Sequence, residues 1–120
     1  MSRAHFLLTT QWFALNQACR AVVDGFGPCV YHVGSSLARA DYRDVDVRCI
    51  LDDADYQRMF PGGQGAAWAL LCAALSEWLS ARTGLPVDFQ FQEQTVANAE
   101  FQGRRSALGI ARRDECAWEG

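Results

Sequence analysis

The sequence contains no lysine, so all eleven of its basic side chains are arginines. This absence excludes a P-loop with its Gly-Lys-Ser/Thr motif, and it excludes enzymes that form a Schiff base through lysine. Arginine is the only permanent side-chain cation available to a phosphate or carboxylate ligand. The formal net charge of −3 also argues against a protein that coats nucleic acid by electrostatics alone.

Zinc-ligand spacing is also absent. The five cysteines and two histidines form no Cys-x-x-Cys or His-x-x-x-His pair. The cysteines are odd in number and mostly have apolar neighbours, so we expect reduced, small core residues and a cytoplasmic location. The apolar run at residues 6–8 is too short for a signal-peptide core or a membrane span, so no membrane association is expected.

The length of 120 residues, half of them hydrophobic, predicts a single domain over residues 1–120 with its own core. Apolar residues three and four apart predict two amphipathic helices, and alternating or β-rich runs predict three strands. The acidic run at residues 52–55 is expected to form a turn. The expected elements are helices over 8–22 and 68–78, strands over 29–33, 44–51 and 87–91, and a short helix from Gln94 to Phe101. They indicate an α/β (α+β) domain, with a small mixed β-sheet and helices packed mainly on one face.

Two aspartates separated by one valine, Asp44-Val45-Asp46, are the most informative local feature. Successive side chains of a strand point to opposite faces, so the two carboxylates are expected on one side of the strand and the valines on the other. Adjacent ionised carboxylates repel each other and lose solvation, and a hard divalent cation relieves both costs. The pair therefore predicts half of a metal site.

Two other short motifs extend this hypothesis. The strand predicted over residues 29–33 ends at Gly34-Ser35, where a glycine lets a phosphate approach the backbone and the serine offers an N–H and a hydroxyl. Asp88 lies on the polar side of the last predicted strand. If that strand neighbours the strand of Asp46, Asp88 becomes a third carboxylate of the same site.

In this order, the parts resemble the nucleotidyltransferase superfamily typified by DNA polymerase beta, most closely its minimal, phage or bacterial type. The family pattern of an apolar strand, Gly-Ser, a turn and Asp-x-Asp matches residues 31–35 and 44–46, and Asp88 fits the third carboxylate. The resemblance covers a motif core of about residues 8–91 and leaves 92–120 as a C-terminal extension. Minimal members often continue with Arg-x-x-Gly, whereas this chain continues with Ser36-Leu37-Ala38-Arg39.

The resemblance implies transfer of a nucleoside monophosphate from an NTP, such as ATP, to a hydroxyl of a small molecule, an RNA or a protein. Two Mg²⁺ ions, or Mn²⁺, would be bound, and the chain would act alone, as a homo-oligomer or with a partner protein. The expected catalytic and metal residues are Asp44, Asp46 and Asp88, and the expected nucleotide-binding residues are Gly34, Ser35, Ser36 and Arg39.

Other functions compete with this hypothesis. A non-catalytic or antitoxin-like nucleotide-binding module of the same fold is the main alternative, because so small a chain has little surface for an acceptor. A glycosyltransferase needs a larger sugar-nucleotide domain, and an RNase-H-like nuclease does not place Gly-Ser here. His32 is expected to be a hydrogen-bonded, partly buried histidine. The Arg104-Arg105 pair either faces the anionic ligand or is a solvated surface.

Overall fold

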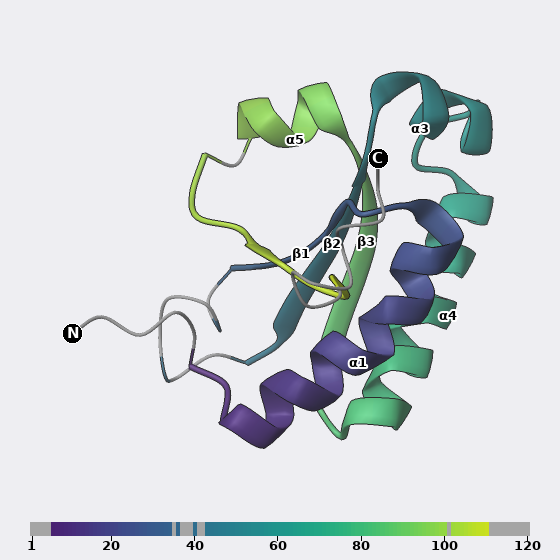
Figure 1. Ribbon diagram of the computed structural model, residues 1–120. Helices are drawn as coiled ribbons and strands as arrows, with labels where there is room; N and C mark the ends of the chain where they lie inside the picture. Colours follow the sequence, from purple (N-terminus) through teal and green to yellow (C-terminus); the bar gives the residue numbers. More distant parts are fainter. Residues whose placement is uncertain (1–5, 35, 37–39, 41–42, 101, 111–120) are drawn as a thin grey trace.

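Four strands form one mixed β-sheet in the order β3-β2-β1-β4 (Figure 1). The computed structural model describes residues 6–34, 36, 40, 43–100 and 102–110, so Ser35 and Arg39 lie outside the described residues. The strands are β1 (Val30–Val33), β2 (Val45–Leu51), β3 (Val87–Glu93) and β4 (Ser106–Ala107). The described helices are α1 (Thr9–Phe26), α3 (Asp53–Met59), α4 (Ala66–Thr83) and α5 (Gln94–Glu100). The expected α/β class and mixed sheet are therefore confirmed.

The two long helices, α1 and α4, lie side by side against one face of the sheet (Figure 1). Each presents an apolar stripe to the core, with Leu15 and Cys19 from α1 and Leu79 from α4 fully buried. Helix α4 ends at Gly84, which has a φ of 72° and therefore takes the left-handed conformation common after a helix. Both helices were predicted from their apolar spacing, and both are longer than predicted.

Strand β2 is central, pairing antiparallel with β1 and parallel with β3. Its residues alternate as predicted, since Val45, Val47 and Cys49 are fully buried while Asp46 and Arg48 are only partly buried. In β3, Phe89 and Phe91 enter the same core. The polar side chains of β2 and β3 consequently share the sheet face opposite α1 and α4.

The prediction that the acidic run at residues 52–55 forms a turn is wrong in part, because this run begins helix α3. The Asp52 carboxylate accepts a hydrogen bond from the Asp55 backbone N–H at 2.8 Å and caps the helix. Asp53 accepts hydrogen bonds from Thr95, at the start of α5. Acidic side chains favour a helix N-terminus because the free backbone N–H groups there carry partial positive charge. These aspartates therefore stabilise α3 and link it to α5.

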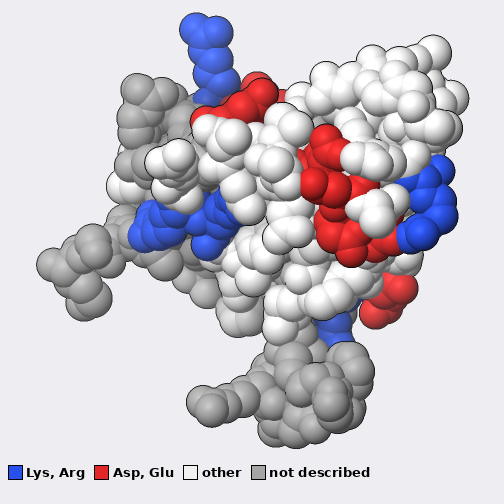
Figure 2. Space-filling model, turned by 90° about the horizontal axis from the view of Figure 1, so that it is seen from above, with Lys and Arg blue, Asp and Glu red and all other residues white. Residues whose placement is uncertain are grey.

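Acidic side chains gather on one side of the face of the molecule near α3 and α5. Figure 2 shows basic side chains directly beside them at the edge of this face, and another basic group that uncharged surface separates from them. Strand β4, which was not predicted, joins the residue 102–110 segment to β1 through the pair Tyr31 and Ala107. None of the described helices is both long enough and apolar enough to cross a membrane.

Candidate functional site

The end of β1 is in direct contact with the carboxylate of Asp46. Val33 is paired with Asp46 across the antiparallel ladder, and Gly34 follows with a φ of 79°. A Cβ atom at Gly34 would collide with the Asp46 carboxylate. Glycine is therefore required here for two reasons, since its backbone takes the left-handed region and its missing side chain leaves room for the carboxylate.

Asp46 and Asp88 are direct partners in the parallel pairing of β2 with β3. Both side chains project from the open face of the sheet, and neighbouring strands are about 4.8 Å apart. The sequence expectation that Asp88 could join Asp46 depended on the adjacency of these two strands, which the structure confirms. Two carboxylates thus lie beside each other with Gly34 at one edge.

Arg48 lies against both carboxylates and was not singled out from the sequence. Its Nη2 is 3.7 Å from Asp46 Oδ1 and 3.4 Å from Asp88 Oδ2, and its Nη1 donates to the Asp88 backbone carbonyl at 2.7 Å. The Arg48 side chain is only 13% exposed, so its positive charge is held at this position. The alternation of β2 contained the signal, because Arg48 is two residues after Asp46 and must share its face.

The charge of Asp46 is disfavoured in the folded protein. Burial of the Asp46 carboxyl is the main cause that raises its pKa, the nearby guanidinium of Arg48 opposes the rise, and the charges of Asp88 and Asp44 add to it. Asp44 itself is exposed and precedes β2 by one residue. It is therefore near enough to act on Asp46 electrostatically, but it is outside the strand in which the sequence pattern placed it.

The three aspartates do not gather into a ready metal cage. Among the residues that the structure describes, no group of three or more His, Cys, Asp and Glu side chains is arranged to hold a metal ion. The chemistry of Asp46 and Asp88 still fits a hard divalent cation. Two neighbouring carboxylates repel each other, and a cation bound by their oxygen atoms would relieve this repulsion. A cation bound there would share the carboxylates with Arg48.

A cavity of about 200 Å³ opens beside these groups. Gly34, Asp46 and Arg48 line it on the sheet side, and Arg105 lines it from the segment that leads to β4. The other described residues that line it are Val33, Ile50 and Gln92. Of the two C-terminal arginines considered from the sequence, Arg105 therefore faces the candidate site.

Ser36, which was expected to bind nucleotide, is fully buried. Its hydroxyl is 2.5 Å from His32 Nε2, and its carbonyl accepts a hydrogen bond from the Phe6 N–H at 2.9 Å. The hydroxyl of Ser36 thus connects the segment after β1 to His32 of β1. His32 is buried and hydrogen-bonded, in line with the expectation for this histidine.

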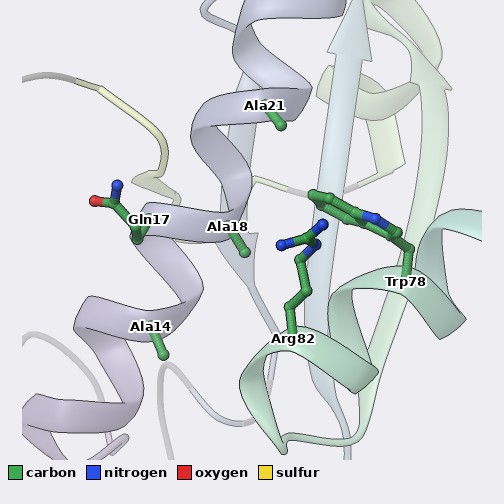
Figure 3. A pocket seen from close by; sticks show the side chains of 6 residues that line it. All are labelled: Ala14, Gln17, Ala18, Ala21, Trp78 and Arg82. Atoms are coloured by element: carbon green, nitrogen blue, oxygen red, sulfur yellow. The ribbon is translucent and has the colours of Figure 1, made fainter.

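A larger groove of about 440 Å³ lies between α1 and α4, on the other side of the sheet (Figure 3). Its α1 wall contains alanines, and on α4 the Arg82 guanidinium stacks over the Trp78 ring at 4.3 Å. Among the described residues that line this groove, Arg82 is the only charged one, and none is a carboxylate or a histidine. The smaller cavity at Asp46 is therefore the better candidate for a catalytic or binding site, because a carboxylate and two guanidinium groups line it.

Comparison with known proteins found no matching family model, no matching curated protein and no matching solved structure.

The collision at Gly34 gives a first prediction. Replacing Gly34 with alanine should displace the Asp46 carboxylate and weaken binding of a Mg²⁺–nucleotide complex, measured by calorimetry. Gly84→Ala is the matched control, because Gly84 has a similar φ of 72° but open space around its Cβ position. Both variants should lose roughly 1–2 kcal/mol of unfolding free energy from the left-handed backbone. Equal ligand affinities of Gly34→Ala and the parent would contradict a role of the close approach between Gly34 and the Asp46 carboxylate in binding.

The raised pKa of Asp46 gives a second prediction. A carboxyl whose folded pKa is above the unfolded value of about 3.9 stabilises the fold fully below that pH, and this contribution is lost as pH rises through the folded pKa. Asp46→Asn removes the titration, so the stability of this variant relative to the parent should increase from pH 3 to pH 7 in the absence of metal. Urea unfolding of both proteins at pH 3 and pH 7 measures this change in relative stability. A relative stability of the variant that falls between pH 3 and pH 7 would mean that the effect of Arg48 on the Asp46 pKa is larger than the effect of burial.

Proposed function

We propose that the chain is a metal-dependent nucleotidyltransferase that moves a nucleoside monophosphate from an NTP to a hydroxyl of an acceptor. The observation that carries the proposal is the convergence of Gly34, Asp46 and Asp88, which come from three separate motifs and meet at one end of three neighbouring strands. Among the described elements, α1, β1, β2, α4 and β3 follow each other in the order that the resemblance implies, with α3 inserted between β2 and α4.

The carboxylates supply the metal-binding part of this proposal. Asp46 and Asp88 would hold Mg²⁺ or Mn²⁺ through their carboxylate oxygens, and the exposed Asp44, one residue before β2, would be the third ligand of the expected set. The chemistry that such a divalent ion would supply is neutralisation of phosphate charge and a lower pKa of the attacking hydroxyl. Asp88, the more exposed of the two strand carboxylates, is available to accept the proton of that hydroxyl.

The turn after β1 supplies the phosphate-binding part. Gly34 lines the cavity, so phosphate oxygens would lie at this end of the sheet, beside the Asp46 carboxylate that fills the space next to Gly34. Ser35 would donate through its N–H and hydroxyl, and Arg39 would add a charge. Ser36 contributes indirectly, because its buried hydroxyl and His32 hold the turn in place.

Substitution of the carboxylates tests the proposal. The single variants Asp44→Asn, Asp46→Asn and Asp88→Asn should each reduce Mg²⁺-dependent labelling of an acceptor by radiolabelled NTP in cell extract by about 10²-fold or more, as expected for loss of a charge-stabilising group. Asp24→Asn, on the exposed surface of α1, is the control and should leave transfer unchanged. The enzyme proposal fails if the parent neither transfers label nor binds any NTP in a metal-dependent way.

A non-catalytic nucleotide-binding module is the second candidate, and Arg48 favours it. In the structure the Arg48 guanidinium already lies 3.7 Å from the Asp46 carboxylate and 3.4 Å from that of Asp88 and offsets part of their charge, so this site can persist without metal. Such a module would bind a nucleotide equally well in Mg²⁺ and in EDTA, and would act through a partner protein. The nucleotidyltransferase proposal instead expects affinity to fall at least about tenfold in EDTA, because the metal bridges phosphate and carboxylate.

The role of Arg48 as internal counter-ion gives a further prediction. Arg48→Met should lower the unfolding free energy by about 1–2 kcal/mol in EDTA, between the effects of exposed ion pairs and of hydrogen bonds to charged groups. Added Mg²⁺ should restore part of this loss by replacing the missing charge. Arg58→Met is the control, because Arg58 pairs with Asp55 on the exposed surface of α3 and should show no response to Mg²⁺. Urea denaturation with and without Mg²⁺ makes the comparison, and equal Mg²⁺ responses of the two variants would refute the counter-ion role.

A further inference from the structure

Two cysteine thiols meet at the start of β1. Cys29 is the residue before β1, Cys49 lies in β2, and their Sγ atoms are 3.5 Å apart. The backbone on both sides is fixed by the sheet. Val30 faces Cys49 across the antiparallel ladder, and the Ile50 N–H donates to the Cys29 carbonyl at 2.8 Å. Both cysteines are free thiols in the structure, so the strands hold two groups close together that oxidation can join.

The two thiols differ in their access to solvent. Cys49 is fully buried in the core, whereas Cys29 is only partly buried. The Cys29 Sγ lies 3.6 Å from the carbonyl oxygens of Phe26 and Gly27, where α1 ends and the chain turns toward β1. A reagent from solution can therefore reach the sulfur of Cys29, and Cys49 reacts only through its contact with Cys29.

The contact also affects the two thiols in opposite ways. The hydrogen bond with the Cys49 thiol lowers the pKa of Cys29, although burial and the charge of Asp52 act against this. The hydrogen bond with Cys29 raises the pKa of Cys49, and burial adds to the rise. Because the thiolate is the nucleophilic form of cysteine, Cys29 is the better attacking group of the pair.

We propose that Cys29 and Cys49 are a thiol oxidation site, at which a low-molecular-weight disulfide converts the pair into a reversible disulfide bond that joins the start of β1 to β2. Disulfides of this kind inside cells are transient and redox-responsive. The inference goes beyond the proposed function and is independent of it, because the site consists of two thiols and needs neither nucleotide nor metal.

The reaction proceeds by two thiol–disulfide exchanges. In the first, the Cys29 thiolate attacks one sulfur of the reagent, whose S–S bond breaks, so that a mixed disulfide forms on Cys29 and one thiolate leaves. In the second, Cys49 attacks the Cys29 sulfur and releases the other half of the reagent as a thiolate. The protons of the two cysteines pass to the two departing thiolates. The cysteine pair is thus oxidised, and the reagent is reduced to two thiols.

Oxidised glutathione added to the folded parent, followed by mass spectrometry, tests the site. We expect the protein to lose the mass of two hydrogen atoms and peptide mapping to locate a link between Cys29 and Cys49, which dithiothreitol reverses. Cys49→Ala should stop at a glutathione adduct on Cys29, because the second thiol is missing. Cys29→Ala should form neither the link nor an adduct on Cys49, because Cys49 is fully buried.

Cys19→Ala is the matched control. Cys19 and Cys49 are both fully buried, so their replacement by alanine removes the same side-chain atoms from the core. Burial raises the pKa of Cys19 to about 12, so its thiol should not take part in exchange, and Cys19→Ala should form the link as the parent does. Urea midpoints in reductant show which variants are folded, and the disulfide map of the parent decides the question without any variant.

The oxidised parent should also have a higher urea midpoint than the reduced parent. A link that fits the folded strands restricts the unfolded chain more than the folded one. An equal or lower midpoint of the oxidised protein would show that the native pair does not accommodate the bond, and would overturn the inference. Absence of a disulfide in the treated parent, or a link that maps to Cys19, Cys72 or Cys116, would overturn it as well.

Discussion

The parallel register of β2 with β3 is the constraint on which the candidate site depends. It places Asp46 directly beside Asp88 on the open face of the sheet, while the alternate side chains of both strands fill the core. The apolar face fixes the register, because a slip by one residue would turn the carboxylates into the core. The hydrophobic effect therefore holds two like charges together, and the folded chain must supply a cation to balance them.

Arg48 supplies that cation within the chain, and in the proposed function a divalent metal would add to it. The carboxylates of Asp46 and Asp88 and the guanidinium of Arg48 thus form one set of alternating charges at the cavity. Removal of any one member changes the affinity for its neighbours, because each charge offsets the next.

Much of the fold follows from local patterns in the sequence. Apolar spacing located α1 and α4, and alternation located β2 and β3, because burial of one face dominates the stability of each element. Helix α3 was missed because Asp52, Asp53 and Asp55 were interpreted as a turn, although the same residues favour a helix N-terminus. Strand β4 is too short for periodicity to reveal, and only its pairing with β1 defines it.

The candidate site was predictable in part. The three aspartates and Gly34 stand out as motifs, but the contact of Gly34 with Asp46 depends on the β1–β2 register. Arg48 was overlooked despite the two-residue alternation that places it beside Asp46. Arg105 reaches the cavity only through the path of residues 102–107 and its hydrogen bonds to α5, and no local pattern encodes such tertiary contacts.

The most direct measurement of the central claim is a crystal structure of the chain with Mn²⁺ and a non-hydrolysable NTP. The account predicts anomalous scattering from Mn²⁺ coordinated by Asp46 and Asp88, with the triphosphate against Gly34. Nucleotide bound elsewhere, or Mn²⁺ absent from these carboxylates while the nucleotide is fully bound, would contradict it.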